Sequence, residues 1–357
     1  MNYRIDYCII KHILIVYTGK FKRINVMNSL NVVMPERNFL FMGKKAKLIL
    51  CVILSIVILC GCTSGNRPNG TSGTPDNSGT PGLNSTGKTF SIVTSFYPMY
   101  LFARSIANNI DNVTVTNMAP PQTGCLHDYT IRPGDMKLLE KADVFIINGA
   151  GIENFIQEVA HQLPLLKVVE ASKGIQLLKN NANAETEFNP HIWVSPSGAI
   201  KQVNNIADSL VALDPGNADL YKRNSADLII RLNDLKSRMD SELKTIKNRN
   251  IVTFHEAFNY FAKDFNLNIV ALIESTPDRQ PSPNEIIATI KTIRDTGTKA
   301  IFTEPQYSAD AASTISRETG AKIYVLDPIV TGTDSPPLDD YFTKMNKNLE
   351  QLKEALK

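Results

Sequence analysis

Three histidines and one aspartate stand at positions where a folded chain could gather them around a cation. His127 lies in a turn-rich loop, His191 follows a proline, His255 ends an apolar run, and Asp327 ends another. Neutral imidazoles and a carboxylate are ligands for Zn²⁺, and four of them can close a tetrahedron around it. His161, in the middle of an expected helix, is interpreted as a surface residue. The four candidates are far apart in the sequence and form no local motif, so histidines held by structural hydrogen bonds are the alternative.

The elements that would position these residues follow from the hydrophobic pattern. Short β-branched runs alternate with amphipathic stretches from Phe90 onward, which predicts an α/β fold with parallel sheets. Ligands bind beyond the carboxyl ends of the strands in such sheets, where the candidate residues are expected. Residues 214–249 carry apolar side chains at helical spacing, which predicts one long helix. Ser282, a proline and Glu285 predict another helix start. The expected strands are FSIVTS, VTVTNMA, VFIING, NIVTF, NIVALI, AIFTE and KIYVL.

Residues 42–61 have the pattern of a bacterial leader. Three lysines precede the apolar run from Leu48 to Leu59, and Gly61 stands before Cys62. A helix of this length rises about 18 Å, short of a bilayer core of about 30 Å, so a signal peptide fits better than a membrane span. The LCGC ending resembles a lipobox, in which Cys62 is lipidated and becomes the mature N-terminus. An ordinary leader cut nearby is the alternative.

The segments around the leader have little material for a core. Residues 1–41 precede a plausible start at Met42 and are expected to be a non-structural upstream extension. Residues 62–88 are almost wholly Gly, Ser, Thr, Asn and Pro, which predicts a flexible tether behind the lipid anchor. Of the five cysteines, only Cys125 remains once the leader and the anchor are set aside, so no disulfide is expected within one mature chain.

The formal charge of +3 comes from the first 61 residues. They hold nine of the 38 basic and two of the 35 acidic residues, leaving 29 basic against 33 acidic residues in the remainder. A body with a net charge of −4 and without a basic patch argues against nucleic acid as a partner.

Seven stretches resemble, in order, the signatures of the zinc/manganese solute-binding lipoproteins of bacterial ABC importers. The resemblance covers residues 89–357. It implies two α/β lobes with parallel sheets flanked by helices, joined by one long rigid helix, with the metal site in the cleft between the lobes. The implied division is an N-terminal lobe at 89–213, the linking helix at 214–249 and a C-terminal lobe at 250–357. The stretches are IVTSFYPMYLFARSIA, HDYTIRPGDMKLLEKADVFIINGAGIE, NPHIWVSP, TFHEAFNYFAKDFNL, PSPNEI, IFTEPQYS and KIYVLDP.

Carried over position by position, the resemblance implies metal ligands at His127, His191, His255 and Asp327. Manganese-type members tend to carry glutamate where His255 stands, and imidazole suits zinc better than manganese. Zn²⁺ is therefore the expected ion and Mn²⁺ the alternative. The histidine-rich loop of many zinc members is absent before PHIW. Cys125 is interpreted as a small loop residue, with approach to the metal as a thiolate as the alternative.

The resemblance predicts an extracytoplasmic binding component that captures Zn²⁺ and delivers it to a membrane permease energised by a separate ATPase. The protein is expected to be a monomer, anchored to the bacterial cell membrane through Cys62. A zinc hydrolase is one alternative, but HEAFN has Asn259 where HExxH requires its second histidine, and four protein ligands leave no open position for water. No enzymatic activity is therefore predicted. A surface adhesin is the other alternative, suggested by the anchor and the tether.

Overall fold

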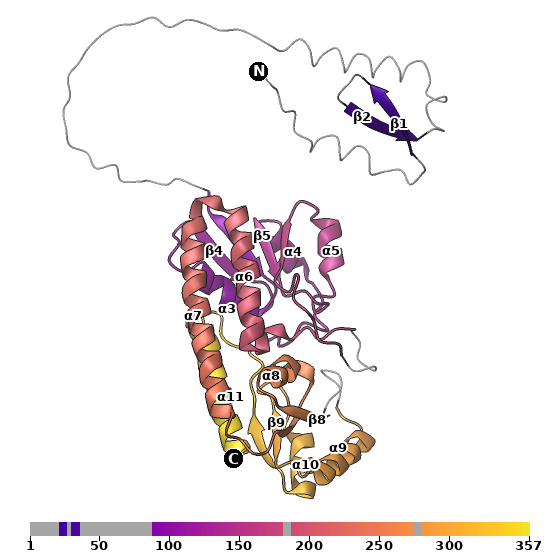
Figure 1. Cartoon of the computed structure of the whole chain (residues 1–357), viewed down its shortest axis with the longest axis vertical. Coiled ribbons are helices and arrows are strands. Elements are labelled where there is room, and N and C mark those ends of the chain that lie inside the picture. Colours follow the sequence, from indigo (N-terminus) through magenta and orange to yellow (C-terminus); the bar gives the residue numbers. More distant parts are fainter. Residues whose placement is uncertain (1–20, 27–29, 36–87, 181–186, 274–279) are drawn as a thin grey trace, which may run out of the picture. The chain divides into compact units, whose positions relative to one another are not determined.

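The computed structural model describes residues 21–26, 30–35, 88–180, 187–273 and 280–357 (Figure 1). The chain divides into two compact units, residues 1–82 and residues 83–357. The predicted leader at 42–61 and the predicted lipidation site at Cys62 lie outside the described residues, as does most of the tether.

The first unit contains two described strands, which the sequence did not predict. β1 (Phe21–Val26) and β2 (Leu30–Pro35) pair antiparallel, with Phe21 opposite Pro35 and Val26 opposite Leu30. They fall within the segment expected to be non-structural, and they belong to a unit separate from the one that carries the predicted ligands.

Four parallel strands form the sheet of the first lobe, in the order β4-β3-β5-β6. The central strands are β3 (Phe90–Thr94) and β5 (Val144–Ile147), and all four residues of β5 are buried, as expected of a parallel strand covered on both faces. The edge strands are β4 (Val113–Asn117) and β6 (Lys167–Glu170). The sequence analysis did not predict β6, which has two adjacent valines between charged residues and buries only Val169.

The second lobe has the same kind of sheet, with four parallel strands in the order β10-β9-β7-β8. Its central strands, β7 (Asn250–Thr253) and β9 (Ala300–Thr303), are the more deeply buried pair. The edge strands are β8 (Asn268–Leu272) and β10 (Lys322–Val325). All the strand runs expected from the sequence therefore form strands, and within each sheet their carboxyl ends meet at one edge.

Helices cover both sheets and connect the strands. In the first lobe they are α3 (Tyr97–Ile106), α4 (Pro133–Leu139), α5 (Ile156–Gln162) and α6 (Pro196–Leu213). In the second lobe they are α8 (Asn259–Asp264), α9 (Pro283–Thr296), α10 (Asp310–Thr319) and α11 (Asp340–Ala355). Short 3₁₀ turns are η1 (Ile192–Val194), η2 (Pro215–Asn217) and η3 (Glu256–Phe258).

The start of α9 is capped as the sequence predicts. The Ser282 hydroxyl accepts a hydrogen bond from the Glu285 N–H, and the Glu285 carboxylate accepts one from the Ser282 N–H. This reciprocal pair satisfies two of the backbone donors that the first helical turn leaves without partners. Among the described residues, none of the helices combines the length and the apolar character that a membrane span requires.

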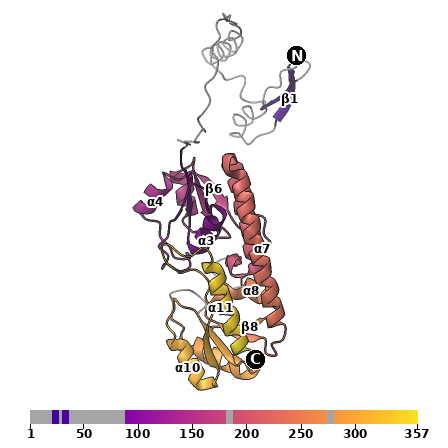
Figure 2. The ribbon, with the colours of Figure 1, turned by 90° about the vertical axis from the view of Figure 1, so that its left-hand side faces the viewer.

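The long helix α7 (Ala218–Leu243) joins the two lobes. It has 26 residues and runs beside both lobes in two perpendicular views (Figures 1 and 2). Its apolar side contacts α3 and α6 of the first lobe and α11 of the second. The buried residues Leu228, Leu232, Leu235 and Met239 recur every three or four positions, which places them on that one side. The predicted architecture of two parallel-sheet lobes and one linking helix is confirmed.

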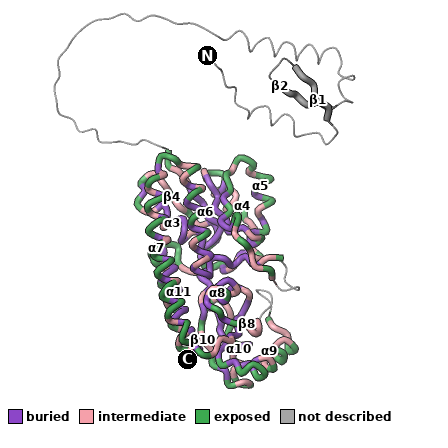
Figure 3. Tube along the Cα trace, viewed as in Figure 1, coloured by how far each residue is buried: buried purple, intermediate pink, exposed green. Residues whose placement is uncertain are grey.

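Buried residues occur in both lobes (purple in Figure 3) and form two hydrophobic clusters. One cluster extends from the first sheet across α6 and α7 to the inner face of α11. A second cluster lies between the second sheet and helices α9 and α10. Because the larger cluster includes residues of both lobes, the lobes share a core, and α11 is packed against α7.

Candidate metal centre

The loop after β4 contributes two side chains to the site, one from each neighbour of a buried leucine. Leu126 is completely buried, whereas its neighbours Cys125 and His127 are partly exposed. Gly124 has φ +82°, a left-handed conformation that favours glycine, so the chain can turn into the Cys125–His127 stretch. The Asn154 side chain donates to the His127 carbonyl at 2.6 Å, which ties this loop to the start of α5.

His191 enters the site just before η1 and is held by Asn189. The Asn189 Oδ1 accepts hydrogen bonds from the His191 backbone N–H at 2.9 Å and from its Nδ1 at 3.1 Å. The same amide donates through Nδ2 to the Glu256 carbonyl, 2.8 Å away in the second lobe. Asn189 therefore orients the imidazole and joins the two lobes, and the opposite ring nitrogen, Nε2, is left facing the site.

His255 follows β7 and is held in the same manner, by a carboxylate. Its Nδ1 donates to Glu304 Oε1 at 2.6 Å, and Glu304 follows the neighbouring strand β9. Gln306 donates to the other carboxylate oxygen at 2.8 Å. His255 and Glu304 are 3% and 2% exposed, so this pair lies in the interior. The Nε2 of His255 then faces the first lobe.

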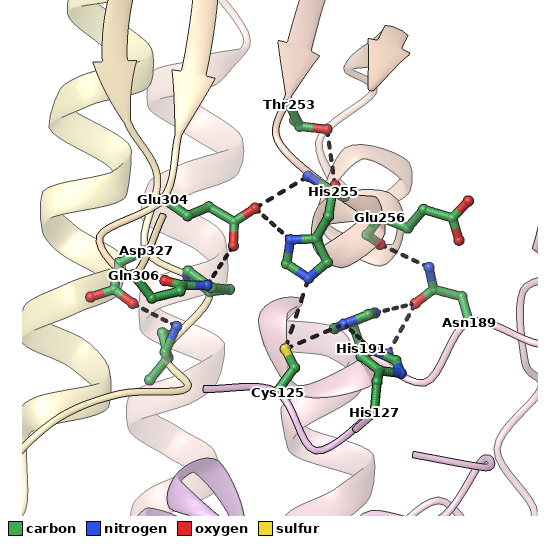
Figure 4. Close-up of polar contacts among 12 residues, drawn as sticks. Cys125, His127, Asn189, His191, Thr253, His255, Glu256, Glu304, Gln306 and Asp327 are labelled. Carbon is green, nitrogen blue, oxygen red and sulfur yellow. Dashed lines mark hydrogen bonds and ion pairs between the residues drawn. The ribbon is translucent and has the colours of Figure 1, made fainter. Parts of the chain in front are cut away.

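The nitrogens of the three predicted histidines and one sulfur converge (Figure 4). His127 Nε2 lies 3.4 Å from His191 Nε2. Cys125 Sγ lies 3.6 Å from His191 Nε2 and 3.8 Å from His255 Nε2. Donor atoms of Cys125, His127 and His191 all lie within 4.8 Å of one another. Residues from both lobes thus surround one small volume with nitrogen and sulfur donors.

Burial and neighbouring charges shift the pKa values of the three histidines in different directions. Burial, together with neighbouring His255, lowers the pKa of His127 to about 4. Burial and the other two histidines lower the pKa of His191 well below its usual value. Burial also acts to lower the pKa of His255, but Glu304 and Cys125 raise it to about 10. At neutral pH and without a metal, His255 is therefore the positively charged imidazole, while the other two are neutral.

Asp327 follows β10 as expected, but its carboxylate has other partners. Oδ2 lies 2.6 Å from Lys344 Nζ, and Oδ1 accepts the Ile329 N–H at 2.7 Å. The Asn348 side chain bonds to the backbone N–H and the carbonyl of Asp327. Figure 4 shows this carboxylate apart from the three imidazoles. The fold brings His127 and the other two predicted histidines together, and it pairs the fourth predicted residue with a lysine.

Comparison with known families identifies the family of the chain. The model of the family described as zinc-uptake complex component A, periplasmic, matches residues 92–355. The chain belongs to this zinc-uptake component family. The match includes both lobes, the linking helix and every residue of the cluster described above.

Two named proteins illustrate the similarity of the chain to known sequences. It is 32% identical over 286 residues to the zinc-binding protein AdcA of Streptococcus pyogenes serotype M6, with 73% of this chain and 55% of AdcA covered. It is 31% identical over 298 residues to the high-affinity zinc uptake system protein ZnuA of Bacillus subtilis, with 78% and 92% covered. The chain thus spans little more than half the length of the AdcA relatives.

A solved structure with a similar fold contains a metal ion. The SBP FpvC from Pseudomonas aeruginosa in complex with Mn²⁺ matches with a TM-score of 0.69 and 30% identity. The match covers 75% of this chain and 99% of FpvC.

Three residues that contact the histidine cluster were not among the ligands predicted from the sequence. Glu304 stands at the carboxyl end of a predicted strand, in IFTEP, and that position was a usable signal. Asn189 precedes the PHIW stretch by one residue, but nothing in its type distinguishes it from a loop asparagine. Cys125 was interpreted as a small loop residue, with approach to the metal as the alternative, and the structure places its sulfur against two imidazole nitrogens.

Proposed function

We propose that this protein is the extracytoplasmic binding component of an ABC importer, which captures Zn²⁺ and delivers it to a permease energised by a separate ATPase. The observation that carries the proposal is the convergence of three imidazoles from two lobes, with His127 Nε2 and His191 Nε2 3.4 Å apart and His255 nearby. The names of the relatives, a zinc-binding protein and a zinc uptake system protein, support this assignment.

The proposed ligands are His127, His191 and His255, with Asp327 as the fourth ligand implied by the family resemblance. For Asp327 to reach the ion, it would have to leave Lys344, which lies 2.6 Å from its carboxylate. Imidazole ligands favour zinc over manganese. Mn²⁺ is the alternative cargo, supported by the Mn²⁺ complex of the similar protein FpvC.

A binding role agrees with a site in which the protein supplies all four ligands. Hydrolysis by zinc requires an open coordination position and a general base. The Glu304 carboxylate, which contacts His255 of the cluster, also accepts a hydrogen bond from Gln306. We therefore propose that the protein binds and releases the ion without catalysis.

The proposed location is the outer face of the cell membrane. The family description names a periplasmic component, which agrees with export of this chain. The leader at 42–61 and the lipobox cysteine Cys62 support attachment through lipid, with residues 62–88 as the tether. The permease and its ATPase are the proposed partners.

Zinc binding by the purified full-length protein tests the proposal directly. Titration against a competing chelator should show one Zn²⁺ per chain, and His191→Ala and His255→Ala should each weaken binding by at least about 10-fold. His161→Ala is the matched control, because His161 is an exposed histidine in α5 and should leave the affinity unchanged. A wild-type protein that binds no zinc would overturn the proposal.

The transport role is tested separately in the producing cell. Loss of the protein should slow growth only when zinc is scarce, and the wild type and His161→Ala should restore growth. His191→Ala should not restore it. Restoration by His191→Ala would show that the histidine cluster has no part in uptake.

A further inference from the structure

The thiol of Cys125 contacts the imidazoles of His191 and His255, and its sulfur lies within 4.8 Å of a ring nitrogen of His127. The ligand set implied by the family resemblance includes no cysteine. We infer that Cys125 is the fourth protein ligand, so that the site is formed by one thiolate and three imidazoles. The inference rests on the proposed function, because it assumes that the cluster binds a metal. It assigns the fourth position to Cys125 in place of Asp327.

The first argument is the spacing of the donor atoms. Zn–N bonds of about 2.0–2.1 Å and a Zn–S bond of about 2.3 Å at tetrahedral angles separate two nitrogens by about 3.3 Å and a nitrogen from the sulfur by about 3.6 Å. The His127–His191 nitrogens are 3.4 Å apart, and Cys125 Sγ is 3.6 Å from His191 Nε2 and 3.8 Å from His255 Nε2. Three of the six distances between the four donor atoms therefore already match those of a zinc tetrahedron.

The second argument is the orientation of the rings. His191 uses Nδ1 to bond to Asn189, and His255 uses Nδ1 to bond to Glu304. Each ring then presents Nε2 to the sulfur of Cys125. The close approach of these nitrogens to the sulfur requires a proton or a cation between them, and Zn²⁺ at this centre would take the place of that proton. The two rings and the sulfur are arranged as ligands that share one centre.

The third argument is the position of charge. Thiolate is the form of cysteine that binds zinc. The Cys125 thiolate and the buried Glu304 carboxylate would together supply two negative charges, which equal the charge of Zn²⁺. A buried ion is tolerated when charge is compensated in this way. Asp327 is not needed for this balance, because Lys344 already neutralises it at 2.6 Å.

The fourth argument is that the Asp327 carboxylate has a structural role. It accepts the N–H of Ile329, a completely buried β-branched residue with φ +63°. Such a residue adopts a left-handed conformation only when its surroundings hold it there. Moving Asp327 to the metal would release both this turn and Lys344. The Cys125 sulfur already lies 3.6 Å from His191 Nε2 and 3.8 Å from His255 Nε2.

A thiolate ligand has a consequence for selectivity. Thiolate is a soft donor that suits Zn²⁺ and is a poor partner for Mn²⁺, which prefers oxygen. With Cys125 and three histidines, the site contains no oxygen ligand from the protein. Zinc should therefore be bound far more tightly than manganese. Loss of the thiolate should reduce the difference between the two affinities.

Cobalt substitution of the full-length protein tests the inference. Co²⁺ bound to a thiolate gives an intense near-ultraviolet sulfur-to-metal charge-transfer band, which oxygen and nitrogen ligands do not give. The wild type and Asp327→Asn should both show the band, and Cys125→Ser should lose it. Cys125→Ser should also weaken zinc binding by at least about 10-fold, and Asp327→Asn should weaken it less. Circular dichroism should show that both variants are folded.

The outcomes separate this inference from the proposed function. Stoichiometric Co²⁺ binding to the wild type without the charge-transfer band would overturn Cys125 as a ligand and leave the importer role standing. A larger loss of zinc affinity in folded Asp327→Asn than in Cys125→Ser would return the fourth position to Asp327. Absence of any Co²⁺ or Zn²⁺ binding to the wild type would overturn the proposed function itself.

Discussion

His255 Nδ1 lies 2.6 Å from Glu304 Oε1, and both side chains are almost completely buried. The two residues follow neighbouring strands, β7 and β9, so the parallel sheet itself brings them together. The carboxylate holds the ring with Nε2 directed at the cluster, and it supplies negative charge next to the place where a cation would lie. A carboxylate in this position commonly controls both the orientation and the basicity of a metal-binding histidine.

The first prediction concerns this carboxylate. Glu304→Gln should weaken zinc binding by about 10- to 100-fold, because an outer partner of a histidine ligand typically has this effect. The amide can still accept the Nδ1 hydrogen bond, so the fold should be retained. Competition with a chelator gives the affinity. Glu350→Gln, which removes an exposed carboxylate from α11, is the matched control and should change nothing. Equal affinities for Glu304→Gln and the wild type would contradict the role of Glu304.

The second prediction is the pH dependence of zinc binding. The pKa of His255 is raised to about 10 by Glu304 and Cys125 against the effect of burial, so zinc must displace a proton from this ring at neutral pH. Affinity should therefore fall steadily as the pH decreases from about 8 to about 5, rather than only near the ordinary imidazole pKa of about 6.5. It should fall more steeply as the pH approaches about 4, where His127 takes up a proton.

Isothermal titration in buffers of different ionisation enthalpy measures the protons released with each zinc ion. Glu304→Gln should shift the loss of affinity to lower pH, because removal of the carboxylate lowers the pKa of His255. An affinity for the wild type that is constant between about pH 6.5 and 8 would contradict protonation of His255 in the metal-free protein.

The third prediction concerns the glycine that lets α6 approach the His191 segment. A Cβ at Gly198 would lie 2.1 Å from the Ile192 carbonyl oxygen, closer than real contacts allow. Gly198→Ala should therefore destabilise the protein by about 1–3 kcal/mol, as overpacking does, and it should weaken zinc binding by displacing His191. Chemical denaturation and chelator competition measure the two effects.

Gly134 offers a matched control for this substitution. It is also a helical glycine, in α4, and an added Cβ would meet nothing within 4 Å. Gly134→Ala should leave zinc binding unchanged and should not destabilise the fold, because alanine is the better helix former. Similar stability losses in the two variants would show that close packing at Gly198 is not the cause.

The fourth prediction uses Trp193, the only tryptophan of the chain. Its ring centroid lies 5.2 Å from that of His191, and its Nε1 donates to the Pro328 carbonyl at 2.8 Å. Co²⁺ has a partly filled d shell and quenches nearby indole fluorescence, so Co²⁺ binding should quench the emission strongly. Zn²⁺ has a filled shell and should not quench by this route.

The variant with both His191→Ala and His255→Ala is the control for this measurement. It should retain the Trp193 emission when Co²⁺ is added at the concentration that saturates the wild type. Quenching of the same extent in this variant would place the bound ion elsewhere on the protein.

Local sequence patterns predicted most of the elements correctly. The β-branched runs form the strands, because side chains buried on both faces of a parallel sheet must be apolar, and these runs are visible in the sequence. Ser282 and Glu285 cap α9, because a capping box depends only on residues three positions apart. The edge strand β6 was missed, because three of its four residues are exposed and its two valines are too few to predict a strand. Its position depends on pairing with β5.

The sequence by itself determined which residue types stand at the ends of the strands, and thus that His127, His191 and His255 could be ligands. It did not determine which fourth side chain faces them, because Cys125 and Asp327 are both at loop positions of suitable chemistry. Only the tertiary structure decided that the Cys125 sulfur lies between imidazoles and that the Asp327 carboxylate lies against Lys344. The physical reason is that distances between donor atoms depend on how two lobes and their loops pack together, and contacts so far apart in the chain leave no local pattern.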